Sequence, residues 1–438
     1  MRDLLMLGIV LGALPFAFRH TWIGVLLWTW ISVMNPHKLT FGFAYDAPWA
    51  AVAAGVTLIS LIVTRDKLSM PWNPAVKVLF AFVVWMCLTT AFAFYPSLSW
   101  VQLNKVLKIQ LMTVVALVAL RERKHIELFI WVNVLSLGYY GFKGGLFTIK
   151  NGGAERVWGP PGGFIEGNNE LAVALVMAIP LMNYLRLVAT RPWVRHGLLT
   201  LMLLTAVSAL GSQSRGALLA VSAMGLVLWF RSERKVMTGI FVGVAAMAAT
   251  TIMSSSWEQR MGTIQNYEQD RSAMGRIEAW RMTANLANHN LLGGGFDIYR
   301  PEIYARYAPD ALQQQGAHSI YFSVLGEHGY VGLFLFLAIW VLAFRTAGQI
   351  RRDAKKRDET AWLHPLASMC QVSLIGYLVG GAFLALSYFD LPYNILVILV
   401  VSLRWLQEKR WEYEPQGAFG AAVPVSQVQA PPQRRFQP

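Results

Sequence analysis

The feature that most constrains this chain is a series of long apolar segments that recur along almost its whole length. A backbone in hydrocarbon must pair its own N–H and C=O groups, so a crossing segment of about 20 residues has to be a helix. Residues 4–34 hold two short runs, interrupted by Arg19 and His20, and Pro15 disfavours a single straight helix. We expect one broken crossing there. The other segments span 47–63, 76–94, 106–120, 126–142, 171–188, 197–211, 216–230, 237–253, 320–344, 366–388 and 391–406.

These segments predict an all-α polytopic integral membrane protein with about 12 transmembrane helices. Composition agrees, because 55% of residues are hydrophobic and 14% are charged, against roughly 25% charged in a soluble domain. A disordered chain, a coiled coil and an ordinary soluble enzyme are excluded. The segments also lack the polar–apolar alternation of an outer-membrane barrel. Cys87 and Cys370 lie inside apolar runs, and we interpret them as core residues.

The net charge of +14 is interpreted mainly as a topology signal. Lys and Arg resist translocation, and they concentrate in one set of loops and in the tail. We therefore place that side in the cytoplasm. A nucleic-acid surface would interleave basic and aromatic residues on one face, and the sequence has no such pattern. The basic loops lie at residues 65–67, 121–124, 186–195, 231–235 and 345–357.

This orientation divides the chain into four regions. Residues 1–253 form the first helices, with a periplasmic loop at about 143–170. Residues 254–317 form a long periplasmic loop that contains amphipathic helices and has six arginines but no lysine. Residues 318–406 form the last helices, and 407–438 a cytoplasmic tail that we expect to be disordered, because it is rich in Pro, Gln and Ala with few charges.

Three arginines at the periplasmic side are candidate anion-binding groups. Arg215 lies at the start of an apolar segment, where it either extends to the interface or faces a cavity. Arg276 and Arg281 begin a stretch whose narrow apolar face has helical spacing, which predicts an interfacial helix. These arginines either contact lipid phosphates or bind a specific diphosphate, which suits the guanidinium fork. The apolar face consists of Ile277, Trp280, Ala284, Ala287 and Leu291.

His318 lies where the long loop re-enters the membrane, and it is the candidate general base. An unperturbed imidazole titrates near neutral pH, which suits removal of a hydroxyl proton. The other interpretation is a histidine whose hydrogen bonds are satisfied at the interface. His328, ten residues later, and His289, in the loop helix, are competing candidates.

The first periplasmic loop supplies another polar group. Arg156 precedes the segment GPPGGFIEGNNE, whose glycines and prolines indicate a specific loop shape. Asn168 and Asn169 then open the next helix, either as helix caps or as binding groups.

No metal or cofactor is expected. The sequence has no phosphate-binding loop GxxxxGK[ST], no GxGxxG between a strand and a helix, no HExxH and no CxxC. Glu268 and Asp270 form the only close acidic pair of the periplasmic side, a weak metal signal. Chemistry on this side then needs a substrate with its own leaving group, such as a lipid diphosphate ester whose developing charge arginines stabilise.

These residues resemble the bacterial O-antigen ligase and polymerase superfamily. The ligase signature, His, then Asn, Ser or Gln, nine residues, Gly, two residues, then Gly, Thr or Tyr, is met by His318, Ser319, Gly329 and Gly332. Arg215 and Leu219 fit a second, looser signature of Arg, three residues and Leu. RIEAW at 276–280 is similar to the arginine motif of the family's long loop. The resemblance covers roughly residues 150–345.

The resemblance implies a glycosyltransferase in the bacterial inner membrane, with its active site facing the periplasm and no cofactor. The donor would be a glycan on undecaprenyl diphosphate, and the acceptor a hydroxyl of lipid A-core. His318 would be the general base, and Arg215, Arg276 and Arg156 would bind the diphosphate, supported by Ser319, Asn169 and Arg281. Because no periplasmic acid stands out as a nucleophile, we expect one metal-independent, inverting displacement.

Three alternatives remain open. The polymerase branch has an arginine followed after ten residues by glycine, a spacing that Arg156 and Gly167 share. A further branch attaches glycans to protein serine or threonine. A lipid-linked sugar transporter would also need arginines and many helices, but the sequence shows no clear repeat of the kind that transporters often have.

Overall fold

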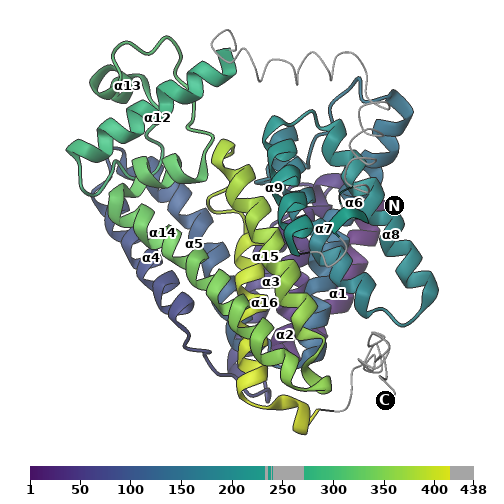
Figure 1. Ribbon diagram of the computed structural model, residues 1–438. Coiled ribbons are helices and arrows are strands. Elements are labelled where there is room, and N and C mark those ends of the chain that lie inside the picture. The colour runs from purple at the N-terminus through teal and green to yellow at the C-terminus, as the bar shows by residue number, and fades with distance from the viewer. Residues whose placement is uncertain (232–234, 238, 240–270, 415–438) are drawn as a thin grey trace, which may run out of the picture.

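The computed structural model describes residues 1–231, 235–237, 239 and 271–414. Every regular element in these residues is a helix, and the helices form one elongated bundle with a small helical layer at one end (Figure 1). The all-α prediction is confirmed for this part of the chain. Their bounds are α1 (Arg2–Arg19), α2 (Thr21–Met34), η1 (Pro36–Leu39), α3 (Trp49–Val63), α4 (Pro74–Ala91), α5 (Pro96–Ala119), α6 (Arg123–Asn151), α7 (Asn168–Val188), α8 (Pro192–Gly211), α9 (Arg215–Arg231), α12 (Arg271–His289), α13 (Pro301–Tyr307), α14 (Ile320–Asp353), η3 (Ala354–Lys356), η4 (Asp358–Thr360), α15 (Leu363–Gly380), η5 (Gly381–Phe383), α16 (Asp390–Gln407) and η6 (Arg410–Glu412).

Six of the described helical segments are long and apolar enough to cross a membrane. They lie at 74–91, 96–119, 168–188, 192–211, 320–356 and 358–383, and the apolar helices α2 and α3 are shorter. Several helices begin with proline at the first helical position, where the missing N–H costs nothing and the ring presets the helical φ angle. The structure therefore supports a multi-pass membrane protein. The predicted segment at 237–253 lies largely outside the described residues.

The first 34 residues do not make one broken crossing. Asp3 accepts hydrogen bonds from the backbone N–H groups of Gly42 and Ala44, at 3.0 and 3.1 Å. The N-terminal end of α1 thus lies beside the chain that follows the C-terminal end of α2. The two helices are antiparallel, and the chain reverses at His20, whose backbone is extended. The sequence pattern located the break, but not the reversal, which depends on packing against α3.

Helix α6 is longer than expected, because it continues to Asn151 through residues that we predicted as loop from about 143. The extension packs tightly on α8. A Cβ atom at Gly145 would lie 2.3 Å from the Leu204 carbonyl oxygen, so only glycine permits this approach of the two backbones. The irregular segment before α7 therefore runs only from about 152 to 167.

Helix α14 is kinked at Gly329, where φ is 67° and ψ is −171°. The loop at 293–295 inserts its backbone at the kink: Gly294 N–H donates to the Gly326 carbonyl at 2.9 Å, and Gly295 N–H donates to the Glu327 carbonyl at 2.9 Å. The interrupted helix carbonyls are thereby satisfied, as buried backbone requires. A Cβ at Gly329 would lie 2.1 Å from the Leu291 carbonyl oxygen. This close approach explains the glycine at that position of the signature.

Helices α12 and α13 form the layer that covers one end of the bundle, beside α4, α5 and the start of α14 (Figure 1). The amphipathic helix was predicted within this loop, but its buried face differs from the prediction. The buried side is centred on Ala279, Met282 and Leu286, which pack against α13. Leu291, which we assigned to the apolar face, follows the helix and is 67% exposed. The reason is that α12 buries its side against protein, which a sequence pattern does not locate.

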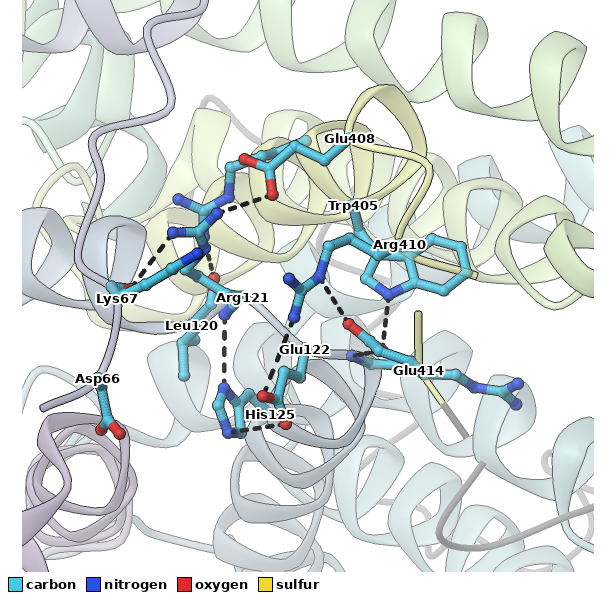
Figure 2. A network of polar contacts seen from close by, with 12 residues as sticks. Asp66, Lys67, Leu120, Arg121, Glu122, His125, Trp405, Glu408, Arg410 and Glu414 are labelled. Carbon is cyan, nitrogen blue, oxygen red and sulfur yellow. Dashed lines mark hydrogen bonds and ion pairs between the residues drawn. The ribbon is translucent and has the colours of Figure 1, made fainter. Parts of the chain in front are cut away.

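The opposite end of the bundle holds a polar network that joins distant loops (Figure 2). Arg121 donates to Glu408 at 2.8 Å and to the Lys67 carbonyl at 3.5 Å, and Arg410 donates to Glu414 at 2.8 Å. Three loops that share basic residues in the sequence therefore meet at one end. The network also holds residues 408–414, the start of the predicted disordered tail; residues 415–438 lie outside the described part.

Candidate active site

The end of the bundle under α12 gathers the N-terminal ends of three helices. Helices α7, α9 and α14 begin at Asn168, Arg215 and Ile320. Helix N-termini carry unpaired N–H groups and a partial positive charge, which favours anions. Most of the residues predicted for the site lie in these helices or just before them. Their contacts decide which of them are brought together.

His318 lies two residues before α14, in a left-handed backbone conformation with φ of 43°. Ser319 follows as the N-cap, and its hydroxyl accepts hydrogen bonds from the N–H groups of Tyr321 and Phe322 at 3.3 and 3.5 Å. This cap marks the start of α14 at Ile320 and leaves His318 outside the helix. Burial lowers the pKa of His318 below its ordinary value, and the charge of Arg276 lowers it further. The imidazole is therefore mostly neutral at pH 7 and able to accept a proton.

Arg276 and Trp280 lie one turn apart on α12 and face this segment. The Trp280 indole N–H donates to the carbonyl of Ala317, directly before His318, at 2.7 Å. The indole also stacks on Phe322, with ring centres 4.9 Å apart and planes 6° apart. Since Arg276 acts electrostatically on His318, one face of α12 carries both the cation and the group that holds the histidine backbone.

The same guanidinium also acts electrostatically on a second helix. The charge of Arg276 acts on the carboxyl group of Glu170, in the first turn of α7. Helix α12 is thus electrostatically connected both to the start of α14 and to the start of α7. This places Arg276 at the junction of the long loop with the bundle.

Arg215 is connected to this region through the short helix η5. A Cβ on the neighbouring Gly216 would lie 3.6 Å from the Gly380 carbonyl oxygen and 3.7 Å from the Cβ of Phe383. The ring of Phe383 also lies beside Trp280, with ring centres 6.1 Å apart. Phe383 is therefore near both the start of α9 and Trp280.

Arg156 belongs to the Arg215 side. Its Nε donates to the Gln213 side-chain oxygen at 3.4 Å, and the Gln213 amide donates to the Gly153 carbonyl at 2.9 Å. Asn168 fastens the same turn from α7, because its amide donates to the Ser212 carbonyl at 2.7 Å. The loop at 152–167 is thus tied to the turn that precedes Arg215.

Two of the residues that we predicted to support the site differ from the others in their surroundings. Asn169 lies in the first turn of α7, half-buried, whereas its neighbour Asn168 makes the structural hydrogen bond. Arg281 is exposed on α12. At 3.6 residues per turn, it projects about 140° around the helix from Arg276. The structure therefore does not bring Arg281 together with Arg276.

Both competing histidines lie elsewhere. His328 is fully buried, and its Nδ1 lies 2.7 Å from the Thr89 hydroxyl. Beside it, Glu327 accepts a hydrogen bond of 2.6 Å from the Tyr388 hydroxyl. His289 is exposed at the far end of α12 and contacts its own helix. These contacts favour His318 as the histidine of the site.

Sequence reasoning missed Phe383 and the role of Trp280. Trp280 was assigned to an apolar face, although a tryptophan one turn after Arg276 was a signal of a shared function. Nothing in the local sequence marks Phe383, because η5 reaches the site only through tertiary packing. Glu268 and Asp270 lie outside the described residues. Among residues 1–231 and 271–414, no group of three or more His, Cys, Asp or Glu side chains could hold a metal ion.

Two protein families match the chain, each over a different range of residues. Residues 1–190 match a family of unknown function (DUF5935), and residues 172–337 match the family described as O-Antigen ligase. No curated protein matches the chain. His318, Arg276 and Arg215 all lie within the second match, whereas Arg156 lies only within the first. The match over residues 172–337 supports the resemblance of this part of the chain to the O-antigen ligase and polymerase superfamily.

Proposed function

We propose that the chain is an O-antigen ligase that transfers a glycan from undecaprenyl diphosphate to a hydroxyl of lipid A-core. The reaction takes place at the periplasmic face of the bacterial inner membrane, without a metal. One observation carries the proposal: α12 connects a guanidinium, Arg276, to a largely neutral imidazole, His318, through electrostatics and the Trp280–Ala317 hydrogen bond. A cation for the leaving group and a base for the acceptor are the two functions that this transfer needs.

The diphosphate binds at the gathered helix N-termini. Arg276 approaches it from α12 and Arg215 from the start of α9, and Arg156 adds a further positive charge from the loop that is tied to Gln213. Fixed guanidinium groups stabilise the negative charge that develops on the diphosphate as the glycosidic bond breaks. Asn169 and Ser319 support this arrangement through the helix starts, and Arg281 assists from the exposed side of α12.

His318 accepts the proton of the acceptor hydroxyl. The acceptor oxygen forms a bond to the anomeric carbon while the bond from that carbon to the diphosphate oxygen breaks. The proton moves to the imidazole, and undecaprenyl diphosphate leaves as the anion. A single displacement of this kind inverts the anomeric configuration. The lowered pKa of His318 keeps the base form populated at periplasmic pH.

A polymerase that uses the same donor is the second candidate. The observation that favours it is Arg156, which precedes Gly167 by the spacing of the polymerase motif and is tied to the turn before Arg215. In that reaction the acceptor is the terminal sugar of a second lipid-linked glycan. A protein serine or threonine is the third acceptor that the same donor site can serve, and a transporter of lipid-linked sugars is the non-enzyme candidate.

The test is a transfer assay with purified full-length protein. The assay contains undecaprenyl-diphosphate-linked glycan and lipid A-core, with a chelator and no nucleotide. We expect glycosylated lipid A-core from the wild type and from His289→Ala, but not from His318→Ala. Longer glycans on the donor lipid would identify a polymerase, and glycan on an added acceptor protein would identify a protein ligase. No transfer to any acceptor, with donor moved across vesicle membranes, would identify a transporter.

A further inference from the structure

Two arginines at the end of the bundle opposite α12 converge on one amide oxygen. Arg231 ends α9 and donates to the Gln371 side-chain oxygen at 3.0 Å, and Arg351, in the last turn of α14, donates to the same oxygen at 3.0 Å. Gln371 lies in α15 and is 2% exposed. Its NH₂ group donates to the Phe344 carbonyl at 3.0 Å, so its oxygen is directed toward the arginines. Three helices thus hold two like charges side by side.

This pair of arginines has no counter-ion among the described residues. Partial burial of the guanidinium and the charge of Arg351 lower the pKa of Arg231 below its ordinary value. A neutral amide oxygen accepts two hydrogen bonds but does not offset two positive charges. The charges of Lys355 and Arg351 also act on His364. The Nε atom of Arg351 and the Nε2 atom of His364 are buried and make no hydrogen bond within the described part of the chain.

The acids nearest in sequence do not fill this role in the described structure. Asp353, two residues after Arg351, accepts a hydrogen bond of 2.7 Å from Lys356. Glu233, two residues after Arg231, lies outside the described residues. The tail at 415–438 contains no Asp or Glu. The cluster therefore has the charge and the donors to bind an external anion.

The cluster lies where the apolar segments of the sequence begin or end. The expected spans at 216–230 and 320–344 end here, and the span at 366–388 begins here. Arg231 directly follows the first of them, and Arg351 follows the second by about two turns and reaches back to Gln371. Phospholipid phosphates lie at this boundary of a bilayer. In the last turns of α9, Leu226 and Phe230 are 57% and 61% exposed, which offers apolar surface to an acyl chain.

We propose that Arg231, Arg351 and Gln371 form a binding site for the phosphate group of an anionic phospholipid. Planar guanidinium groups suit phosphate oxygens and stay charged, and basic pockets between membrane helices are typical sites for anionic head groups. The two positive charges favour a lipid with net negative charge over a zwitterionic one, whose choline would bring a further cation. Gln371 holds the two arginines in place. A soluble phosphate ester offers the same oxygens, so the test separates the two sources.

The proposal does not depend on the transferase function. Arg231 and Arg351 lie at the far ends of α9 and α14 from Arg215 and His318, and the site is tested by binding alone. A bound phosphate would offset the repulsion between the two arginines and so join α9 to α14 at this end.

The test is native mass spectrometry of the full-length protein in detergent, with phosphatidylglycerol or phosphatidylcholine of equal chain length added. We expect the Kd of the first bound phosphatidylglycerol to be about tenfold lower, the size of one charge-assisted interaction. In the double variant Arg231→Gln, Arg351→Gln, the two lipids should bind equally. The matched double variant Arg345→Gln, Arg352→Gln removes the same charge from exposed positions of α14 and should retain the preference. A monodisperse elution profile checks the fold of each variant.

Gln371→Glu tests the site with both arginines in place. Its carboxylate would offset their charge from within the protein, so the preference for phosphatidylglycerol should be lost, and an unchanged preference would contradict the proposal.

Equal binding of the two lipids by the wild type would overturn the proposal, and a preference that then appeared in Glu233→Gln would identify that acid as the counter-ion. A preference that survives the Arg231 and Arg351 changes would overturn it as well. Displacement of phosphatidylglycerol by an equal concentration of glycerol phosphate would show that the occupant is a soluble phosphate and not a lipid.

Discussion

The two polar ends of the bundle use the same residue types in opposite ways. At the end drawn in Figure 2, Arg121 pairs with Glu408 and Arg410 with Glu414, both at 2.8 Å. At the other end, the charge of Arg276 acts on an imidazole, and Arg156 contacts an amide oxygen at 3.4 Å. At the first end, the pair of Arg121 and Glu408 joins two loops. At the other end, Arg276 acts on both His318 and Glu170, and Arg156 contacts an amide. The comparison teaches that the partners of the arginines, and not their number, distinguish the two ends.

The largest effect is expected from the group that takes the proton. His318→Ala should lower the rate of glycan transfer by about 10²–10⁴-fold, the usual contribution of a general base. Thermal stability of the detergent-solubilised protein should change little, because the side chain is only half-buried. His289→Ala, in the same layer, is the matched control and should retain full activity. A transfer rate near that of the wild type in His318→Ala would show that His318 is not the general base.

The second-largest effect is expected from replacing Arg276, the cation proposed to stabilise the leaving group. Arg276→Gln should lower the rate of transfer by about 10²–10³-fold, because a fixed donor to the developing charge is lost. Arg306→Gln, on the neighbouring helix α13, is the control because it makes the same change of charge. The Arg306 side chain lies over the ring of Tyr307 rather than beside His318. If both variants lost activity equally, the loss would come from the net charge of the layer and not from one positioned guanidinium.

The pH profile tests whether Arg276 acts on His318 directly. The base must be neutral, so the rate falls as the pH drops through the pKa of His318. Burial and the charge of Arg276 hold this pKa below its ordinary value. Removing the charge raises the pKa, so the acidic limb of the residual activity of Arg276→Gln should move to higher pH. An unmoved or lowered limb would contradict the electrostatic contact.

Trp280→Phe should have a smaller effect. Phenylalanine keeps the ring stacked on Phe322 but loses the N–H that donates to the Ala317 carbonyl. We expect kcat to fall about fivefold, since a lost hydrogen bond of about 1 kcal/mol loosens the backbone before His318. KM for the donor should change much less, and Trp131→Phe on α6 is the reference. A change in KM alone would mean that Trp280 binds substrate and does not position the base.

The smallest effect is expected at the opposite end. A double-mutant cycle on Arg121→Ala and Glu408→Ala should give a coupling of about 0.2–1 kcal/mol in unfolding, the range of partly exposed ion pairs. The transfer rate should equal that of the wild type. A large loss of activity from Arg121→Ala would contradict the proposal that the catalytic residues lie only at the other end.

Several parts of this organisation could be predicted from local sequence. Six of the expected spans appear as helices that are long and apolar enough to cross a membrane. The basic residues of the loops at 65–67 and 121–124 and of the tail grouped these segments on one side, and the network in Figure 2 joins them. The helix that begins near Arg276 also follows from the spacing of its apolar residues. Each of these depends on interactions of a residue with solvent, lipid or its nearest chain neighbours.

Other parts could not be predicted, because they depend on contacts between distant segments. The reversal between α1 and α2 is visible in the bonds from Asp3 to Gly42 and Ala44. The buried face of α12 follows from packing on α13 and α14, and Phe383 reaches Trp280 only because α15 ends beside α14. No periodicity within one segment carries this information.

The sequence by itself determined that this protein is a helical membrane protein and which of its loops lie on the same side. It also identified His318, Arg215 and Arg276 as candidate catalytic and binding residues. Only the tertiary structure decided which of them share an environment. The hydropathy of a segment depends only on the residues of that segment, so spans can be predicted from local composition. The field of Arg276 on His318 and the hydrogen bond of Trp280 to Ala317 require α12 to lie against the start of α14. That juxtaposition is set by the packing of side chains far apart in the chain.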